Sequence, residues 1–238
     1  MLSVDQLTVR RGRITTLADI SLTLLAGKTL AVVGESGAGK STLIAAILGL
    51  LRPSSGRITW LDAPVRDCKP ALVMQEPRAA FNPALSLKQS VLEPVRTDDI
   101  APRLSRLCKG LELPLELLDR RPSEVSIGQA QRVGILRALI SAPPLVLFDE
   151  PLSALDAVTQ KHTARLISDL QREEGFAALI VTHDLGYAIA HADEIAVLKS
   201  GRIDQVTCPD TFIRAPGSDY CRSLRDAAIA LGGLEQIV

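Results

Sequence analysis

The sequence predicts an α/β fold built around a largely parallel sheet. The first observation is that short, almost entirely apolar runs recur at residues 29–33, 145–148 and 178–181. Strands that are covered on both faces have this composition, because neither face meets water. The second observation is that segments with helical apolar spacing, residues 41–50 and 158–173, lie between these runs. Strands that alternate with helices indicate parallel pairing, since each parallel connection needs a crossover.

The start of the chain predicts two further strands. Residues 2–9 alternate loosely between apolar and polar side chains, and residues 17–25 alternate more clearly. Such alternation is typical of strands with one buried face. Residues 26–28 then turn the chain into the apolar run at 29–33.

The middle of the chain, residues 77–142, has a different character. It is rich in Leu and Arg, contains several prolines and has few β-branched runs. We expect a helical lobe here, inserted into an α/β region formed by residues 1–76 and 143–238. The whole chain, 1–238, is then a single domain.

Composition excludes some classes of function. Lys plus Arg and Asp plus Glu are 27 each, so the formal net charge is zero, which argues against nucleic acid as a partner. No apolar stretch approaches the ~20 residues that cross a bilayer. The first residues lack the features of a signal peptide, so a cytoplasmic protein is expected. The four cysteines form no C-x-x-C pair and are expected to be buried free thiols.

The most informative segment is GESGAGKS, residues 34–41, which fits the P-loop pattern G-x-x-x-x-G-K-[ST]. Its glycines let successive N–H groups turn toward an anion, and the following helix adds the positive end of its dipole. Lys40 is expected to reach the β- and γ-phosphates, and the Ser41 hydroxyl to ligate Mg²⁺. The predicted nucleotide-binding residues here are Gly34, Glu35, Ser36, Gly37, Ala38, Gly39, Lys40, Ser41 and Thr42.

Polar side chains end two of the predicted core strands. Asp149 and Glu150 follow one apolar run, and His183 follows another. Ligands of open α/β sheets bind at such carboxyl ends. Asp149 is predicted to hold Mg²⁺, Glu150 to act as general base toward water, and His183 to reach the γ-phosphate. Paired acids also occur at solvated strand ends, and a lone histidine is more often structural.

Together these residues resemble the nucleotide-binding subunit of ATP-binding cassette (ABC) transporters, over essentially the whole chain. The motifs occur in the family's order. They resemble the Walker A loop (34–41), the Q-loop glutamine (Gln75), the signature motif SIGQAQR (126–132), Walker B (145–150), the D-loop SALD (153–156) and the switch histidine (His183).

The resemblance implies a P-loop NTPase (RecA-like) core with an N-terminal antiparallel β subdomain and an inserted helical subdomain. It implies a head-to-tail dimer that closes on ATP and Mg²⁺, with the nucleotide capped by the partner's signature motif. It assigns Gln75 to catalysis and to the metal. Further nucleotide contacts implied by the resemblance are those of Arg11, Ser126, Gly128, Gln129 and Asp156.

Two positions depart from the family's pattern. Ile127 replaces the first signature glycine. Either its β-branched side chain weakens hydrolysis at the site it caps, which favours a non-identical partner, or it points away and changes nothing. Arg11 stands where the family usually has an aromatic residue that stacks on adenine, so base selectivity is expected to be loose.

Residues 75–83, QEPRAAFNP, and the tail around Phe212 and Tyr220 resemble the peptide/opine/nickel importer group. In this group a tyrosine precedes a short closing helix. The resemblance implies a second, non-identical ATPase subunit, two permease subunits, an extracytoplasmic solute-binding protein and a place at the cytoplasmic face of the membrane. No iron–sulfur cluster is expected, because closely spaced cysteines are lacking.

Two other functions remain open on the sequence. One is a soluble ABC ATPase without a permease, of which the iron–sulfur assembly type is hardest to exclude. The other is a largely non-hydrolysing regulatory subunit, which Ile127 favours and Glu150 and His183 oppose.

Overall fold

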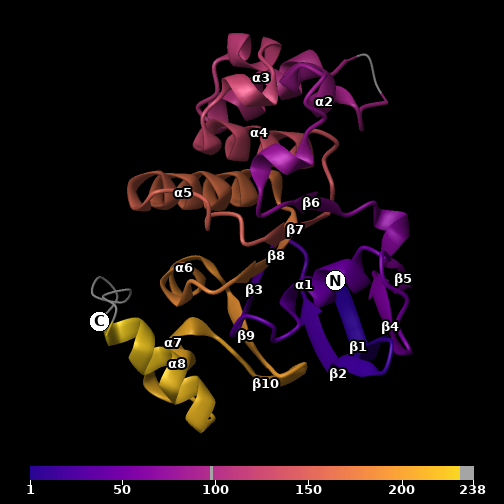
Figure 1. Cartoon of the computed structure of the whole chain (residues 1–238), viewed down its shortest axis with the longest axis vertical. Coiled ribbons are helices and arrows are strands. Elements are labelled where there is room, and N and C mark those ends of the chain that lie inside the picture. The colour runs from indigo at the N-terminus through magenta and orange to yellow at the C-terminus, as the bar shows by residue number, and fades with distance from the viewer. Residues whose placement is uncertain (97–98, 231–238) are drawn as a thin grey trace.

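The computed structural model describes residues 1–96 and 99–230 and contains two β-sheets. A six-stranded sheet has the order β10-β9-β3-β8-β7-β6, and a four-stranded sheet has the order β2-β1-β4-β5 (Figure 1). The strands are β1 (Leu2–Arg11), β2 (Ile14–Leu24), β3 (Thr29–Val33), β4 (Ser55–Trp60), β5 (Ala63–Pro64), β6 (Ala71–Val73), β7 (Leu145–Asp149), β8 (Ala177–Thr182), β9 (Glu194–Lys199) and β10 (Arg202–Thr207). The helices are α1 (Lys40–Ile47), α2 (Leu87–Leu92), α3 (Ala101–Gly110), α4 (Ile127–Leu139), α5 (Ala157–Glu174), α6 (Leu185–His191), α7 (Pro209–Arg214) and α8 (Asp219–Ala230).

The six-stranded sheet confirms the predicted parallel core. Strands β6, β7, β8, β3 and β9 pair in parallel, and only β10 joins antiparallel at the edge. All five residues of β3 are buried, as the apolar composition predicts. Val33 lies opposite Thr182, and Asp149 lies opposite Val181. The carboxyl ends of β3, β7 and β8 therefore meet at one edge of the sheet.

The four-stranded sheet is antiparallel, as the resemblance implied. Strands β1 and β2 are both longer than the sequence indicated. Five strands had no expected counterpart: β4, β5, β6, β9 and β10. Several of these are short, β6 having only three residues, and alternation over so few positions carries little signal.

The hydrophobic core occupies both faces of the six-stranded sheet. On one face, α1 packs between the two sheets, with Leu43 and Ile47 fully buried against side chains of β1, β2 and β3. Helix α1 ends three residues before the predicted limit, because the chain turns at Gly49 with φ of 73°. Helix α5 matches its predicted range to within one residue at each end.

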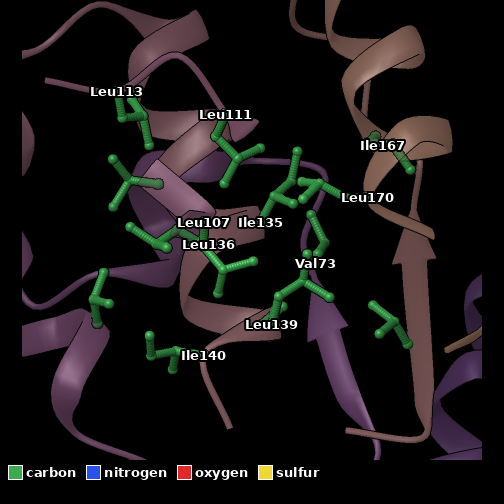
Figure 2. Close-up of a cluster of buried hydrophobic side chains, with 14 of the residues drawn as sticks. Val73, Leu107, Leu111, Leu113, Ile135, Leu136, Leu139, Ile140, Ile167 and Leu170 are labelled. Carbon is green, nitrogen blue, oxygen red and sulfur yellow. The ribbon is translucent and has the colours of Figure 1, made fainter. Parts of the chain in front are cut away.

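Helices α2, α3 and α4 gather at one end of the molecule, away from the four-stranded sheet (Figure 1). Figure 2 shows that their core is continuous with the central part: Leu111 and Ile135 lie beside Leu170 of α5, and Val73 of β6 lies below them. These helices fall within the predicted helical segment. The domain limits remain predictions, and their ranges include residues 97–98 and 231–238, which lie outside the described part.

The C-terminal helices α7 and α8 pack near β9 and α6, where Phe212 and Cys221 are completely buried. Tyr220 was expected to precede the closing helix, but it lies in the first turn of α8. The expectation for the cysteines was partly wrong: all are free, yet Cys208 is exposed and Cys68 is only partly covered. Within residues 1–96 and 99–230, no helix combines the length and apolarity that a membrane span requires.

Candidate functional site

The P-loop connects the buried strand β3 to helix α1, and its glycines are required by close contacts. A Cβ on Gly39, whose φ is 109°, would lie 2.7 Å from Cδ2 of Leu17. A Cβ on Gly34 would lie 2.1 Å from the carbonyl oxygen of Leu198 in β9. The loop is therefore held between β2 and β9, and larger residues have no room at these two positions.

Lys40 is folded into the loop that it ends. Its side chain belongs to a residue only 7% exposed, and Nζ donates to the carbonyl oxygens of Gly34 at 2.8 Å and Glu35 at 3.1 Å. Burial lowers the pKa of Lys40, and the charges of Glu150 and Asp149 oppose that shift. The loop thus holds the positive charge of Lys40 where a phosphate group could bind to it.

Ser41 and Asp149 come together from distant parts of the sequence. The Ser41 hydroxyl donates to Oδ1 of Asp149 at 3.4 Å, although 108 positions separate the residues. Burial raises the pKa of Asp149, and the hydrogen bond from Ser41 opposes this shift. A hydroxyl beside a partly buried carboxylate is an oxygen-only donor set, the kind that Mg²⁺ prefers.

Glu150 follows β7 with an unusual backbone, at φ of 45°. Its N–H donates to the carbonyl of Val181 in β8, at 2.9 Å, and its carbonyl accepts from the Ser153 hydroxyl at 3.1 Å. Its Oε2 lies 2.7 Å from Nδ1 of His183. The carboxyl side chain is 17% exposed and the imidazole 64% exposed, so the pair opens to solvent on the histidine side.

Lys40, Ser41, Glu150 and His183 line a cavity of about 490 Å³, a volume typical of small-molecule sites, whereas Asp149 lies behind Ser41 and is not part of the lining. The residues that line it are Thr16, Ser36, Gly37, Gly39, Lys40, Ser41, Thr42, Gln75, Glu150 and His183. Sequence reasoning missed Thr16, because the second strand was expected to begin at residue 17 and no motif marks the position. Three of the predicted loop residues do not line the cavity: Gly34 and Ala38 are buried, and Glu35 is exposed. The carbonyl of Ala38 accepts a hydrogen bond from the N–H of Gly201.

Other predicted site residues lie away from this cavity. Arg11 is exposed at the end of β1 and does not line it. Asp156 caps α5: its carboxylate accepts from the N–H groups of Val158 and Thr159. The hydrogen bonds from Thr159 hold the pKa of Asp156 below its usual value. The predicted nucleotide contacts of Arg11 and Asp156 remain predictions.

The signature segment forms the start of α4. Ser126 is the N-cap, its hydroxyl accepting from the Gln129 N–H at 3.1 Å, while the Gln129 side chain accepts from the Ser126 N–H at 2.9 Å. This capping box fixes the first turn. Ile127 begins the helix with an ordinary negative φ and a 45% exposed side chain, so the position imposes no backbone strain. A Cβ on Gly128 would lie 3.0 Å from Thr159.

The family profile for ABC transporters matches residues 17–153. The oligopeptide transport ATP-binding protein OppF of Escherichia coli K12 is 35% identical over 225 residues, 87% of this chain and 67% of that protein. The nickel import ATP-binding protein NikE of the same organism is 36% identical over 204 residues, 79% of this chain and 76% of that protein.

Solved structures agree with these relatives. CbiO1 of Clostridium perfringens, part of the ABC transporter complex cbiONQ, superimposes with a TM-score of 0.81 at 26% identity, covering 99% of this chain and 98% of that one. The ATP-binding cassette MJ0796, a dimer bound to ADP and Pi, superimposes with a TM-score of 0.75 at 26% identity. The match covers 88% of this chain and 99% of that one. With the P-loop, the paired acids and the six-stranded sheet in place, the chain belongs to the ABC transporter family, as an ATP-binding ATPase subunit.

Proposed function

We propose that this chain hydrolyses ATP to drive a membrane importer for small peptides, nickel or metal chelates. The observation that carries the proposal is the contact of Glu150 with His183, at 2.7 Å, in the cavity that Lys40 and Ser41 also line. A carboxylate that can take a proton from water thus faces an ammonium group that can bind phosphate. This is the arrangement that phosphoryl transfer to water needs.

Mg²⁺ fits the residues present. Ser41 and Asp149 would hold it, and Gln75, which lines the same cavity, would complete the protein's oxygen donors. Bound there, Mg²⁺ supplies positive charge to the phosphate oxygens. Burial raises the pKa of Asp149, whereas a cation bound beside the carboxyl group would favour its ionised form.

In the proposed reaction, Glu150 accepts a proton from the water that attacks the γ-phosphate. His183 holds the carboxylate in place through Nδ1. Lys40, whose Nζ now contacts two loop carbonyls, would turn to the β- and γ-phosphates. The N–H groups of the loop and the start of α1 add neutral donors. The water oxygen bonds to phosphorus as the bond to ADP breaks, giving ADP and phosphate.

The signature segment supports a dimer as the working unit. The start of α4, capped by Ser126, lies outside the nucleotide cavity of its own chain, so these donors are available to a nucleotide on another subunit. ATP would then be bound between two subunits, and the dimer would close only when ATP is present. The exposed Ile127 would lie in that interface, and the proposal places a non-identical ATPase subunit opposite it.

A second cavity supports a permease contact. It measures about 310 Å³ and lies where β6, residues 77–80 and α4 meet. Its lining is largely apolar and includes Met74 and Pro77. Gln131 also lines it, only 1% exposed, and neither polar atom of its amide has a hydrogen-bond partner among the described residues. We place a polar turn of a permease subunit in this cavity. Met74 lines it and the next residue, Gln75, lines the nucleotide cavity, so movement of the permease would shift Gln75 relative to the nucleotide.

The importer class rests on relatives that are named for oligopeptide and nickel import, and on the resemblance of residues 75–83 to the peptide/opine/nickel importer group. The proposed complex contains two permeases and receives solute from an extracytoplasmic binding protein. The chain itself would lie on the cytoplasmic face. Relatives of this kind favour the importer over the soluble and the regulatory alternatives.

The test is purification of the tagged chain from gently solubilised native membranes, with an untagged strain as control. Recovery of two multi-span permeases and a second cassette subunit is expected, with ATPase activity that rises when binding protein and solute are added to the reconstituted complex. Recovery of soluble partners alone would overturn the importer and leave a soluble cassette ATPase.

A further inference from the structure

The C-terminal helix reaches the nucleotide loop through one side chain. The hydroxyl oxygen of Tyr220, in the first turn of α8, accepts a hydrogen bond from the backbone N–H of Glu35 at 3.3 Å. The two residues are 185 positions apart, and Glu35 is the second residue of the P-loop. Tyr220 does not line the nucleotide cavity, so it contacts the loop from the outer side.

Lys40 holds the same peptide group from the opposite side. The carbonyl of Gly34 and the N–H of Glu35 belong to one planar peptide unit. The carbonyl accepts from Lys40 Nζ at 2.8 Å, while the N–H donates to Tyr220. In the empty loop this peptide plane is bonded at both ends and cannot rotate without breaking one of the bonds. When Lys40 turns to the phosphates, the bond to Tyr220 is the one that still holds the plane. Its orientation decides where the first turn of the P-loop directs its backbone groups.

Tyr220 is itself firmly placed. Lys199 Nζ lies 4.5 Å from the centre of its ring, a cation–π contact. The next residue, Cys221, is completely buried, and its thiol donates to Asp204 of β10 at 3.2 Å. Burial raises the pKa of the Tyr220 phenol, so the hydroxyl stays neutral at physiological pH. The tyrosine is thus anchored to β9 and β10 rather than to the loop it contacts.

The turn between β9 and β10 supports the other end of the loop. The N–H of Gly201 donates to the carbonyl of Ala38 at 2.9 Å, and the carbonyl of Gly201 accepts from Ala18 in β2 at 2.8 Å. The loop is therefore braced at both ends by the C-terminal third of the chain. Only the brace at Glu35 depends on a side chain, because the other is a bond between backbone groups.

We propose that Tyr220 is a positioning residue of the ATPase site, which fixes the peptide between Gly34 and Glu35 and thereby sets nucleotide affinity. A loop that is already ordered loses less conformational freedom when the phosphates bind. The chemical step depends on Glu150 and His183, which lie across the cavity. Loss of the hydroxyl therefore weakens binding of ATP and ADP and leaves the rate at saturation nearly unchanged.

The test is Tyr220→Phe in the full chain, which keeps the ring above Lys199 and removes the oxygen. One neutral hydrogen bond corresponds to a change of about 3- to 10-fold in an equilibrium constant. We expect the Kd for ADP and the KM for ATP to rise by about this factor, with kcat within about 2-fold of wild type. The matched control is Ser223→Ala, also in α8, whose hydroxyl donates only to Asp219 within the helix.

ADP titration needs no turnover, so the result stands apart from the importer assignment. An unchanged Kd for ADP in Tyr220→Phe would overturn the proposal. So would a fall in kcat with KM unchanged, which would place the hydroxyl in the chemistry. The urea midpoint of unfolding is measured for both variants. If the urea midpoint of Tyr220→Phe fell far enough to account for the weaker ADP binding, the proposal would also be overturned, because the tyrosine would then only stabilise the fold.

Discussion

Nδ1 of His183 lies 2.7 Å from Oε2 of Glu150, and the register of two neighbouring strands creates this contact. Strands β7 and β8 run parallel with Asp149 opposite Val181, and the N–H of Glu150 continues the pairing by donating to Val181. A shift of one position in this register would turn the glutamate to the other face of the sheet. The pairing of buried strands thus holds the proposed base beside its partner.

Glu150→Gln is expected to bind ATP as well as wild type and to lose turnover by at least about 100-fold, the usual contribution of a general base. The amide keeps the size of the side chain but takes no proton from water. The measurements are the affinity for ATP, the rate of phosphate release and the fraction of dimer formed when ATP is added. Retained hydrolysis would remove Glu150 from the role of base.

Lys40→Ala is expected to abolish measurable nucleotide binding. The ammonium group is lost, and so are its bonds to the Gly34 and Glu35 carbonyls that shape the empty loop. Fluorescent-nucleotide titration is the measurement, with Lys161→Ala on the exposed face of α5 as the control. If ATP affinity were the same in both variants, the P-loop assignment would be wrong.

Asp149→Asn is expected to stabilise the fold at neutral pH while it abolishes most hydrolysis. Burial raises the pKa of Asp149 in the folded state above its ordinary value of 3.8. The folded protein therefore holds this proton more tightly than the unfolded chain, and the resulting stability is lost as pH rises through the folded pKa. At neutral pH the buried charge costs stability, and asparagine removes that cost.

The measurement for this variant is urea unfolding at pH 7 and at a pH near the ordinary pKa. The gain over wild type should be larger at pH 7 and should shrink on acidification. Asp119→Asn, an exposed aspartate, is the control and should show no such gain. A destabilised Asp149→Asn at pH 7 would show that the bond from Ser41 outweighs burial.

Gly34→Ala is expected to lower the free energy of unfolding by more than about 2 kcal/mol, because the cost of overpacking adds to the cost of a strained backbone. The new methyl group would lie 2.1 Å from a backbone oxygen of β9, which cannot rotate away. Gly49→Ala is the matched control: its φ is also positive, at 73°, but a Cβ there meets nothing within 4 Å. It should cost about 1 kcal/mol. Equal losses in chemical denaturation would refute the close approach at Gly34.

Met74→Glu is expected to prevent recovery of the permeases from solubilised membranes. Met74 is 41% exposed at the edge of the cavity beside Gln75, so the fold tolerates a charge there, but the charge disrupts the largely apolar lining that would receive the permease turn. Leu115→Glu, at a side chain 49% exposed that does not line this cavity, is the control. Normal recovery of permeases with Met74→Glu, at unchanged thermal stability, would place the contact elsewhere.

Much of the site could be predicted because its signals are local. The P-loop joins glycines to a strand and a helix within one short segment, and Asp149 and Glu150 directly follow an apolar run. The strand at 29–33 and the helix at 158–173 were predicted nearly to the residue, because burial on both faces and helical spacing are properties of consecutive side chains. The order of strands along the chain then favoured a parallel sheet.

The sequence by itself determined the fold class, the phosphate loop, the paired acids and the family. Only the tertiary structure decided which distant groups meet: Thr16 in the cavity, His183 against Glu150, and Tyr220 against Glu35. The tertiary structure also decided that Cys208 is exposed and that Asp156 caps α5. The physical reason is that local patterns fix conformation and burial along one segment, whereas contacts between segments depend on strand register and packing across the whole domain.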